Sequence, residues 1–115
     1  MVRVKICGIT DVEDALVAAR YGADALGFVF YPKSPRYITP DRAARIIREI
    51  PPFVAAVGVF VDPTPEELER VIERCPLDYV QLHGAETPEF CRKVRHQLGK
   101  KVIKAFRIKD ESSLE

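Results

Sequence analysis

Short apolar runs alternate with amphipathic segments along the whole chain. The runs are almost continuous in apolar residues, which is typical of strands buried on both faces. In the segments between them, apolar positions recur every three or four residues, as they do along one face of a helix. The pattern predicts strands over residues 2–6, 25–30, 53–61, 79–82 and 102–108.

Residues suited to capping mark where the intervening helices begin. Thr10, followed three residues later by Glu13, predicts a capping box at the start of the first helix. The other three helices share a different signal, a threonine that can cap the helix and a proline at its first position. These threonines are Thr39, Thr64 and Thr87.

A strand–loop–helix unit therefore occurs four times and is followed by a fifth strand. Apolar strands connected by helices predict an α/β fold with a parallel sheet covered by helices. Two architectures fit this pattern, an open doubly wound sheet and part of a (βα)₈ barrel. Because the composition is even and no linker interrupts it, we expect residues 1–115 to form one domain.

The composition is that of an ordinary globular protein of 115 residues, 47% hydrophobic and 30% charged. A net charge of +1 gives no reason to expect a nucleic-acid or anionic membrane partner. The apolar runs fall short of the roughly 20 residues of a membrane helix, and the N-terminus does not resemble a signal peptide. Three cysteines without a Cys-x-x-Cys pair predict a reducing, cytoplasmic environment.

Polar side chains interrupt one face of several predicted strands. Strand alternation puts Lys5 and Cys7 on one face, and likewise Gln81 and His83; we expect Lys104 on the corresponding face of the fifth strand. In a doubly wound sheet that face would be covered by helices, and buried charges there would be costly. A barrel tolerates polar groups near its catalytic mouth, so these residues favour the barrel.

The same polar residues fall where α/β proteins concentrate their function. Cys7, His83 and the loop that contains Arg36 lie at the C-terminal ends of predicted strands. Position alone leaves two interpretations of Cys7 open, since cysteine is also a common buried filler of cores.

Four motifs closely resemble those of the phosphoribosylanthranilate isomerase family: KICGIT at 5–10, GADALGFVFYPKSPRYI at 22–38, VGVFV at 57–61 and VQLHG at 80–84. The resemblance continues through VIKAF at 102–106. It implies a TIM-type (βα)₈ barrel and an isomerase of tryptophan biosynthesis that needs no metal or organic cofactor. The implied reaction is the Amadori rearrangement of N-(5-phosphoribosyl)anthranilate to 1-(2-carboxyphenylamino)-1-deoxyribulose 5-phosphate.

The resemblance also implies roles for individual residues. Cys7 matches the general base, and Arg36 matches the group that pairs with the anthranilate carboxylate. Gln81 and His83 look like substrate-binding residues of the pocket. Lys5 is a candidate cation that would favour the thiolate, although a lysine satisfied inside the barrel is an equal alternative. The two histidines are far apart, with no carboxylate at ligand spacing, so we expect no metal site.

The resemblance covers the N-terminal part of the family pattern. A (βα)₈ barrel needs at least about 200 residues. The family's general acid is an aspartate after a sixth strand, and its phosphate site follows the seventh and eighth, whereas the runs here reach a fifth strand. We therefore expect part of a longer enzyme, with two alternatives: a half-barrel that pairs with a second copy, or a catalytically incomplete binding module. Open barrel edges would favour a homodimer.

Overall fold

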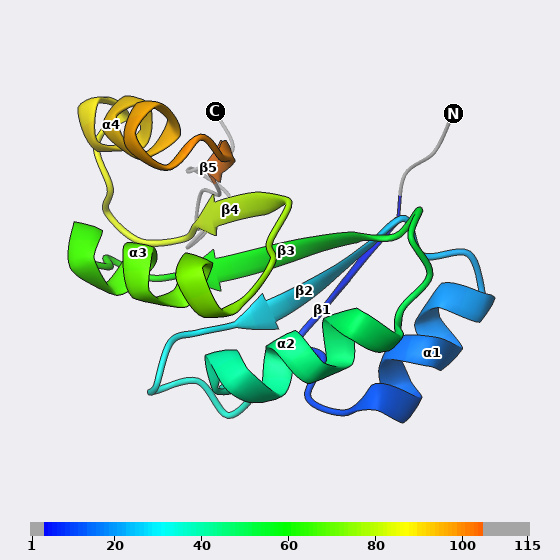
Figure 1. Ribbon diagram of the computed structural model, residues 1–115. Helices are drawn as coiled ribbons and strands as arrows, with labels where there is room; N and C mark the ends of the chain where they lie inside the picture. Colours follow the sequence, from blue (N-terminus) through cyan, green and yellow to red (C-terminus); the bar gives the residue numbers. More distant parts are fainter. Residues whose placement is uncertain (1–3, 105–115) are drawn as a thin grey trace, which may run out of the picture.

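Strands and helices alternate strictly through residues 4–104, the part of the chain that the computed structural model describes (Figure 1). The elements are β1 (Lys5–Cys7), α1 (Val12–Arg20), β2 (Ala25–Val29), α2 (Pro40–Glu49), β3 (Ala55–Phe60), α3 (Pro65–Arg74), β4 (Tyr79–Leu82), α4 (Pro88–Leu98) and β5 (Lys101–Lys104).

The five strands form one parallel sheet in the order β1-β2-β3-β4-β5. Because each strand pairs with the next one along the chain, right-handed crossovers put every connecting helix on the same side of the sheet. In Figure 1 the helices follow one another around the outside of the curved sheet. A doubly wound sheet would reverse its strand order and carry helices on both faces. The strand order therefore confirms the predicted partial barrel.

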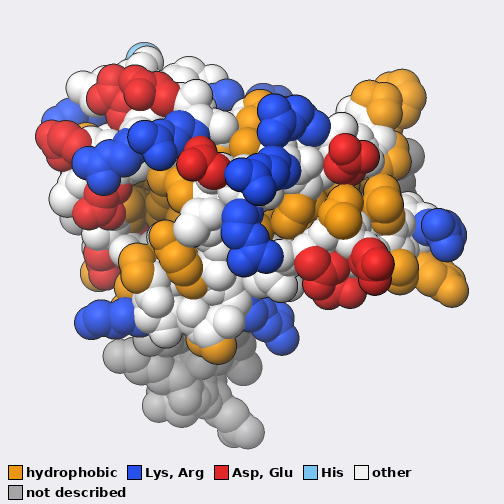
Figure 2. All heavy atoms as spheres, turned by 60° about the horizontal axis from the view of Figure 1, so that its bottom comes forward, with side chains coloured by type: hydrophobic (Ala, Val, Ile, Leu, Met, Phe, Trp, Pro, Cys, Tyr) orange, Lys and Arg blue, Asp and Glu red, His pale blue; other side chains and the backbone are white. Residues whose placement is uncertain are grey.

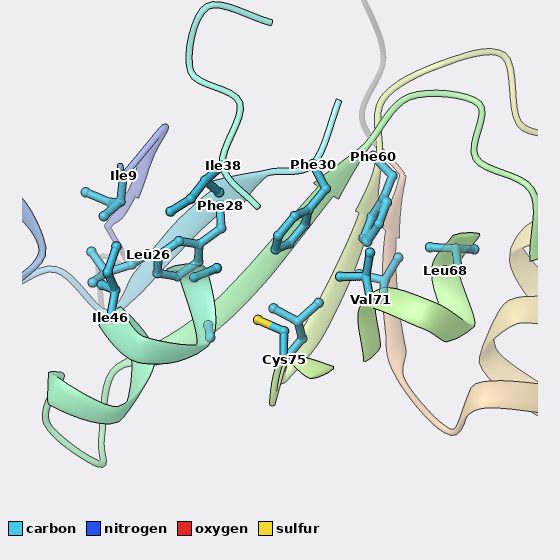
Figure 3. Packing of buried hydrophobic residues seen from close by; sticks show 14 of the residues in the cluster. Ile9, Leu26, Phe28, Phe30, Ile38, Ile46, Phe60, Leu68, Val71 and Cys75 are labelled. Atoms are coloured by element: carbon cyan, nitrogen blue, oxygen red, sulfur yellow. The ribbon is translucent and has the colours of Figure 1, made fainter. Parts of the chain in front are cut away.

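The hydrophobic core lies between the sheet and its helices. Leu26 and Phe28 of β2, Phe60 of β3 and the outer residues of β4 pack there against the apolar faces of the helices (Figure 3). The helices contribute buried residues such as Ala15, Ala43, Ile46, Leu68, Val71 and Val94. Their solvent side mixes acidic and basic side chains (Figure 2), as amphipathic surface helices require. Within the described residues, no helix has the length and apolar character needed to span a membrane.

The helix starts follow the sequence signals at three of four positions. The hydroxyls of Thr39, Thr64 and Thr87 accept bonds from amides three residues later, as predicted. The prediction for the first helix was wrong by one residue. Its N-cap is Asp11, whose Oδ1 accepts from the amide of Asp14 at 2.8 Å. A carboxylate carries the negative charge that a helix N-terminus favours, so Asp11 displaces its neighbour Thr10 from the cap.

Several strand boundaries differ from the predicted ones by one or two residues. β3 begins at Ala55 rather than at Phe53, whose side chain is 97% exposed. The amide of Val54 donates to the carbonyl of Pro51, so a turn occupies the predicted start of the strand. β1 ends at Cys7, one residue beyond the predicted run 2–6, so this cysteine is the last strand residue. The predicted parts of the first and fifth strands at residues 2–3 and 105–108 lie outside the described residues.

The prediction that Lys104 lies on the inner face of the sheet was also wrong. Lys104 pairs in register with Leu82, whereas Ile103 pairs with Gln81. Register partners in neighbouring parallel strands point to the same face. Lys104 therefore shares the helix-covered face with Leu82, and Ile103 takes the inner position beside Gln81.

Candidate active site

Cys7 is held at the C-terminal end of β1 by a sharp backbone turn. Gly8 has a φ of +88°, which glycine adopts without the steric cost of a Cβ. The amides of Gly8 and Ile9 both donate to the carbonyl of Gly27, at 3.0 and 3.1 Å. The side chain of Ile9 is then buried in the core, while that of Cys7 stays exposed.

A glycine in the neighbouring strand makes room for the thiol. Cys7 pairs in register with Gly27 of β2. A Cβ at position 27 would lie 2.9 Å from the Cys7 sulfur, closer than such contacts allow. The sulfur therefore lies directly over Gly27 on the inner face of the sheet. Sequence reasoning missed Gly27, although a glycine inside an apolar strand is a recognised sign of close approach.

Arg36 reaches the same place from the loop between β2 and α2. Its amide donates to Ser34 Oγ at 3.1 Å, and the loop closes where the amide of Ile38 donates to the carbonyl of Val29. The arginine side chain lies against Gly8: a Cβ there would come within 2.4 Å of Arg36 Cδ and 2.9 Å of Nη1. The structure thus brings Arg36 beside Cys7.

Cys7, Gly8 and Arg36 line one groove of about 620 Å³ along β1 and α1. Cys75 differs from Cys7: its side chain is packed in the core, and the residue is only 1% exposed. Burial raises the pKa of the Cys75 thiol to about 11. The Cys7 thiol, in contrast, is exposed beside this groove; its role as a base stays a prediction.

Lys5 and Gln81 meet across the inner face of the sheet. Lys5 Nζ donates to Gln81 Oε1 although β2 and β3 lie between their strands. Lys5 pairs with Ala25, whereas Gln81 aligns through Val59 with Val29, four positions further along β2. An offset of about one residue per strand is the stagger of an eight-stranded barrel with a shear number of 8.

This pairing accounts for two of the predicted site residues. Gln81 is 7% exposed, and its amide oxygen is occupied by the lysine ammonium. The contact corresponds to a lysine satisfied inside the barrel; support of the Cys7 thiolate by Lys5 stays a prediction.

His83 follows β4 directly, and its amide donates to the carbonyl of Phe60 at 2.8 Å. Its side chain is partly buried at the C-terminal ends of the strands, which we call the rim. Beside it lie Asp62, Glu86 and Lys104, a charged cluster that sequence reasoning missed. The available signal was the position of Asp62 and Glu86 shortly after the third and fourth strands.

No group of three or more histidine, cysteine, aspartate or glutamate side chains in residues 4–104 is arranged to hold a metal ion. Besides the charged groups of Asp62, Glu86 and Lys104, this part of the chain offers the thiol of Cys7, the guanidinium of Arg36, the imidazole of His83 and the amide of Gln81. These groups can move protons and bind a carboxylate.

The fold and this rim define a class of protein. A parallel sheet in sequential order, with its helices outside and polar residues at the strand ends, is the wall of a (βα)₈ barrel of the enzyme type. In such barrels catalytic residues come from the C-terminal ends of different strands, which is where Cys7, Arg36 and His83 are found.

The chain belongs to the N-(5'-phosphoribosyl)anthranilate (PRA) isomerase family, whose model matches residues 4–115. A curated N-(5'-phosphoribosyl)anthranilate isomerase from Geobacter sulfurreducens is 59% identical over 115 residues, which are 100% of this chain and 55% of the relative. The chain therefore spans about half the length of the curated relatives it matches.

Two solved structures show the likeness of the fold. One is a phosphoribosyl anthranilate isomerase in complex with reduced 1-(o-carboxyphenylamino)-1-deoxyribulose 5-phosphate. It is 54% identical with a TM-score of 0.91, over 99% of this chain and 58% of that one. The other contains monomers generated from the dimeric isomerase of Thermotoga maritima. It is 51% identical with a TM-score of 0.89, over the same shares of the two chains.

Proposed function

We propose that this chain carries the base and the carboxylate-binding group of a phosphoribosylanthranilate isomerase. The observation that carries the proposal is the juxtaposition of Cys7 and Arg36 at the rim, where Gly27 and Gly8 leave room for their side chains. Membership of the family and the similar isomerase with a bound reduced product analogue support it. The substrate would be N-(5-phosphoribosyl)anthranilate.

The residue types suit the steps of an Amadori rearrangement. A general acid protonates the ribose ring oxygen, and the ring opens to an imine. A general base then removes the proton on C2′, and the electron pair of that bond moves toward the imine to give the enol form of the product. Cys7 as a thiolate would be this base. Nothing in these steps is oxidised by an outside agent, so proton transfer alone suffices and we propose no cofactor.

Arg36 would hold the anthranilate end of the substrate. Its planar guanidinium can donate two parallel bonds to a carboxylate, which fixes both distance and orientation. Gln81 and His83 would contact the substrate from β4, and Lys5 would supply positive charge on the same inner face as the Cys7 thiolate.

We further propose that residues 1–115 form one domain, the N-terminal portion of the barrel, and that it pairs with a second copy. The outer edges of β1 and β5 support pairing, because each of them pairs with a single strand within residues 4–104. The dimeric isomerase of Thermotoga maritima also supports it. Free thiols at all three cysteines support our proposal of a cytoplasmic location.

A turnover assay tests the proposed function. The protein expressed from the complete reading frame that contains these residues should convert freshly prepared N-(5-phosphoribosyl)anthranilate to the deoxyribulose product, detected by mass and by the changed anthranilate spectrum. Well-folded protein that neither converts this substrate nor binds the reduced product analogue would refute the proposal. A half-barrel whose only property is pairing with a second copy would show neither turnover nor analogue binding, and it would form dimers in a concentration-dependent way.

A further inference from the structure

Glu86, in the loop between β4 and α4, is a carboxylate buried at the rim. Its Oε1 accepts from the amide of Gly84 at 2.8 Å and from Lys104 Nζ at 3.0 Å. Its Oε2 accepts from the amide of Asp62 at 2.8 Å. The side chain is 3% exposed, so these contacts replace water around both oxygens. One carboxylate therefore joins the ends of β3, β4 and β5.

Two further contacts complete this group of Asp62, Gly84, Glu86 and Lys104, which we call the Glu86 cluster. Asp62 Oδ1 accepts from the amide of Ala85 at 2.8 Å, so the loops after β3 and β4 bond to each other in both directions. Lys104 Nζ also donates to the carbonyl of Gly84 at 2.5 Å. Asp62 holds a φ of +45°, a strained conformation for a residue with a Cβ.

The surroundings of Glu86 favour its ionised form. Burial alone would raise the pKa of its carboxyl. The bond from Lys104 and the bonds from backbone amides outweigh that effect and hold the pKa below its usual value. A buried charge is tolerated only where such partners are complete. Removing the charge would weaken the bonds that the amides of Asp62 and Gly84 and the ammonium of Lys104 make to this carboxylate.

The cluster holds the peptide immediately after His83. The amide of Gly84 donates to Glu86, and the carbonyl of Gly84 accepts from Lys104. The amide of His83 itself is fixed on Phe60 of β3. His83 therefore stands between two anchored positions, and the second of them depends on Glu86.

We propose that Glu86 is a positioning residue that holds His83 in the orientation needed to bind substrate; this role rests on the proposed function. Glu86 acts through His83 and the loop 83–86 and not by contact with the reacting atoms. Loss of Glu86 should misplace the His83 side chain and so weaken substrate binding by about 10- to 100-fold.

The variants Glu86→Gln and Glu86→Ala test this role, with Glu89→Gln as matched control. Glu89 lies three residues away on α4, and its side chain is 76% exposed. Glutamine keeps the shape of Glu86 but must turn an amide group toward the donors around it. Thermal unfolding first identifies which variants are folded. If Glu86→Ala does not fold, the milder variant Glu86→Gln is used for the test.

The first readout is binding of the reduced product analogue, in a double-mutant cycle with His83→Ala. We expect Glu86→Gln to weaken binding by about 10-fold or more in the native background and to have little further effect once His83 is removed. Equal losses in both backgrounds would overturn action through His83. Failure of the unaltered protein to bind the analogue would instead refute the proposed function.

The second readout needs no ligand and separates these failures. In protein labelled with ¹⁵N-histidine, the imidazole signals of His83 should shift or broaden in Glu86→Gln, while those of exposed His96 should stay unchanged. Glu89→Gln should change neither. Unchanged His83 signals in a folded Glu86→Gln variant would overturn the proposal, whatever the outcome with the analogue.

Discussion

At the scale of single residues, the site depends on the absence of side chains as much as on their presence. Gly27 leaves space for the Cys7 sulfur, and Gly8 leaves space for the Arg36 side chain. The two functional groups come from segments almost 30 positions apart, and they meet because neither glycine has a Cβ in the way.

Gly27→Ala should displace the Cys7 thiol, which we propose to be the base. The new methyl group would lie 2.9 Å from Cys7 Sγ and 3.2 Å from its Cα, so the cysteine must shift. We expect turnover to fall by about 10- to 100-fold, and overpacking to cost about 1–3 kcal/mol of unfolding free energy. Gly58→Ala is the matched control, since its methyl would press on Leu77 in the core. If both variants lower turnover of folded protein equally, Gly27 has no special relation to Cys7.

Arg36→Met should weaken binding selectively. A charge-assisted hydrogen bond contributes about 1.5–3 kcal/mol, so ligands with the anthranilate carboxylate should bind about 10- to 100-fold more weakly. Analogues without the carboxylate should bind almost as before. Titration calorimetry with both ligand types measures this, with Lys33→Met from the same loop as control. Equal losses for both types would mean that Arg36 only supports the loop.

At the scale of secondary-structure elements, the sequence predicted which strands and helices form, and in which order, better than it predicted where each begins and ends. Periodicity located every described strand and helix, because burial of an apolar face requires it. The ends depended on competition between neighbours, as when Asp11 took the cap expected for Thr10 and a turn occupied the predicted start of β3. The face of Lys104 depended on sheet register, which a strand's own alternation does not determine.

The Glu86 cluster joins three strand ends, and its contribution to stability should depend on pH. The folded state holds the pKa of Glu86 below its ordinary value of 4.5, so the unfolded chain takes up the proton first as the pH falls. The stabilisation is therefore complete above that value and is lost as the pH drops through the lower, folded pKa.

Urea unfolding of the native protein and Glu86→Gln across pH 3–7 measures this dependence. The native protein should be more stable near neutral pH, and the difference should shrink below pH 4.5. Glu89→Gln should show a much smaller dependence because its carboxylate is exposed. A difference that is constant over the whole range would contradict an ionised, stabilising Glu86.

At the scale of the whole molecule, five strands form part of a barrel wall. The sequential parallel order and the diagonal contact from Lys5 to Gln81 are those of such a wall. The fold class was predictable because apolar strands, helices and polar strand ends leave few architectures. The family resemblance singled out Cys7 and Arg36, and their roles stay predictions. Gly27 and the Glu86 cluster were not, because their importance appears only once separate strands lie side by side.

The 115-residue chain should associate through its open edges. Val4, Ile6 and Val17 along the first strand and helix are each more than 40% exposed, which is unfavourable for apolar side chains beside an unpaired strand edge. Sedimentation over a wide concentration range should show dimers, and Ile6→Lys should shift the equilibrium toward monomers. A folded monomer at all concentrations, unaffected by the substitution, would contradict this expectation.

The most direct test of the central claim, that Cys7 is the base of an isomerase, is turnover of N-(5-phosphoribosyl)anthranilate by Cys7→Ser and Cys7→Ala. Both are compared with the unaltered protein from the complete reading frame. Loss of a general base should lower kcat by about 10²–10⁴-fold. Binding of the reduced product analogue should remain within a few-fold, because Arg36 and the rest of the site are intact. Near-normal turnover by both variants would contradict the account.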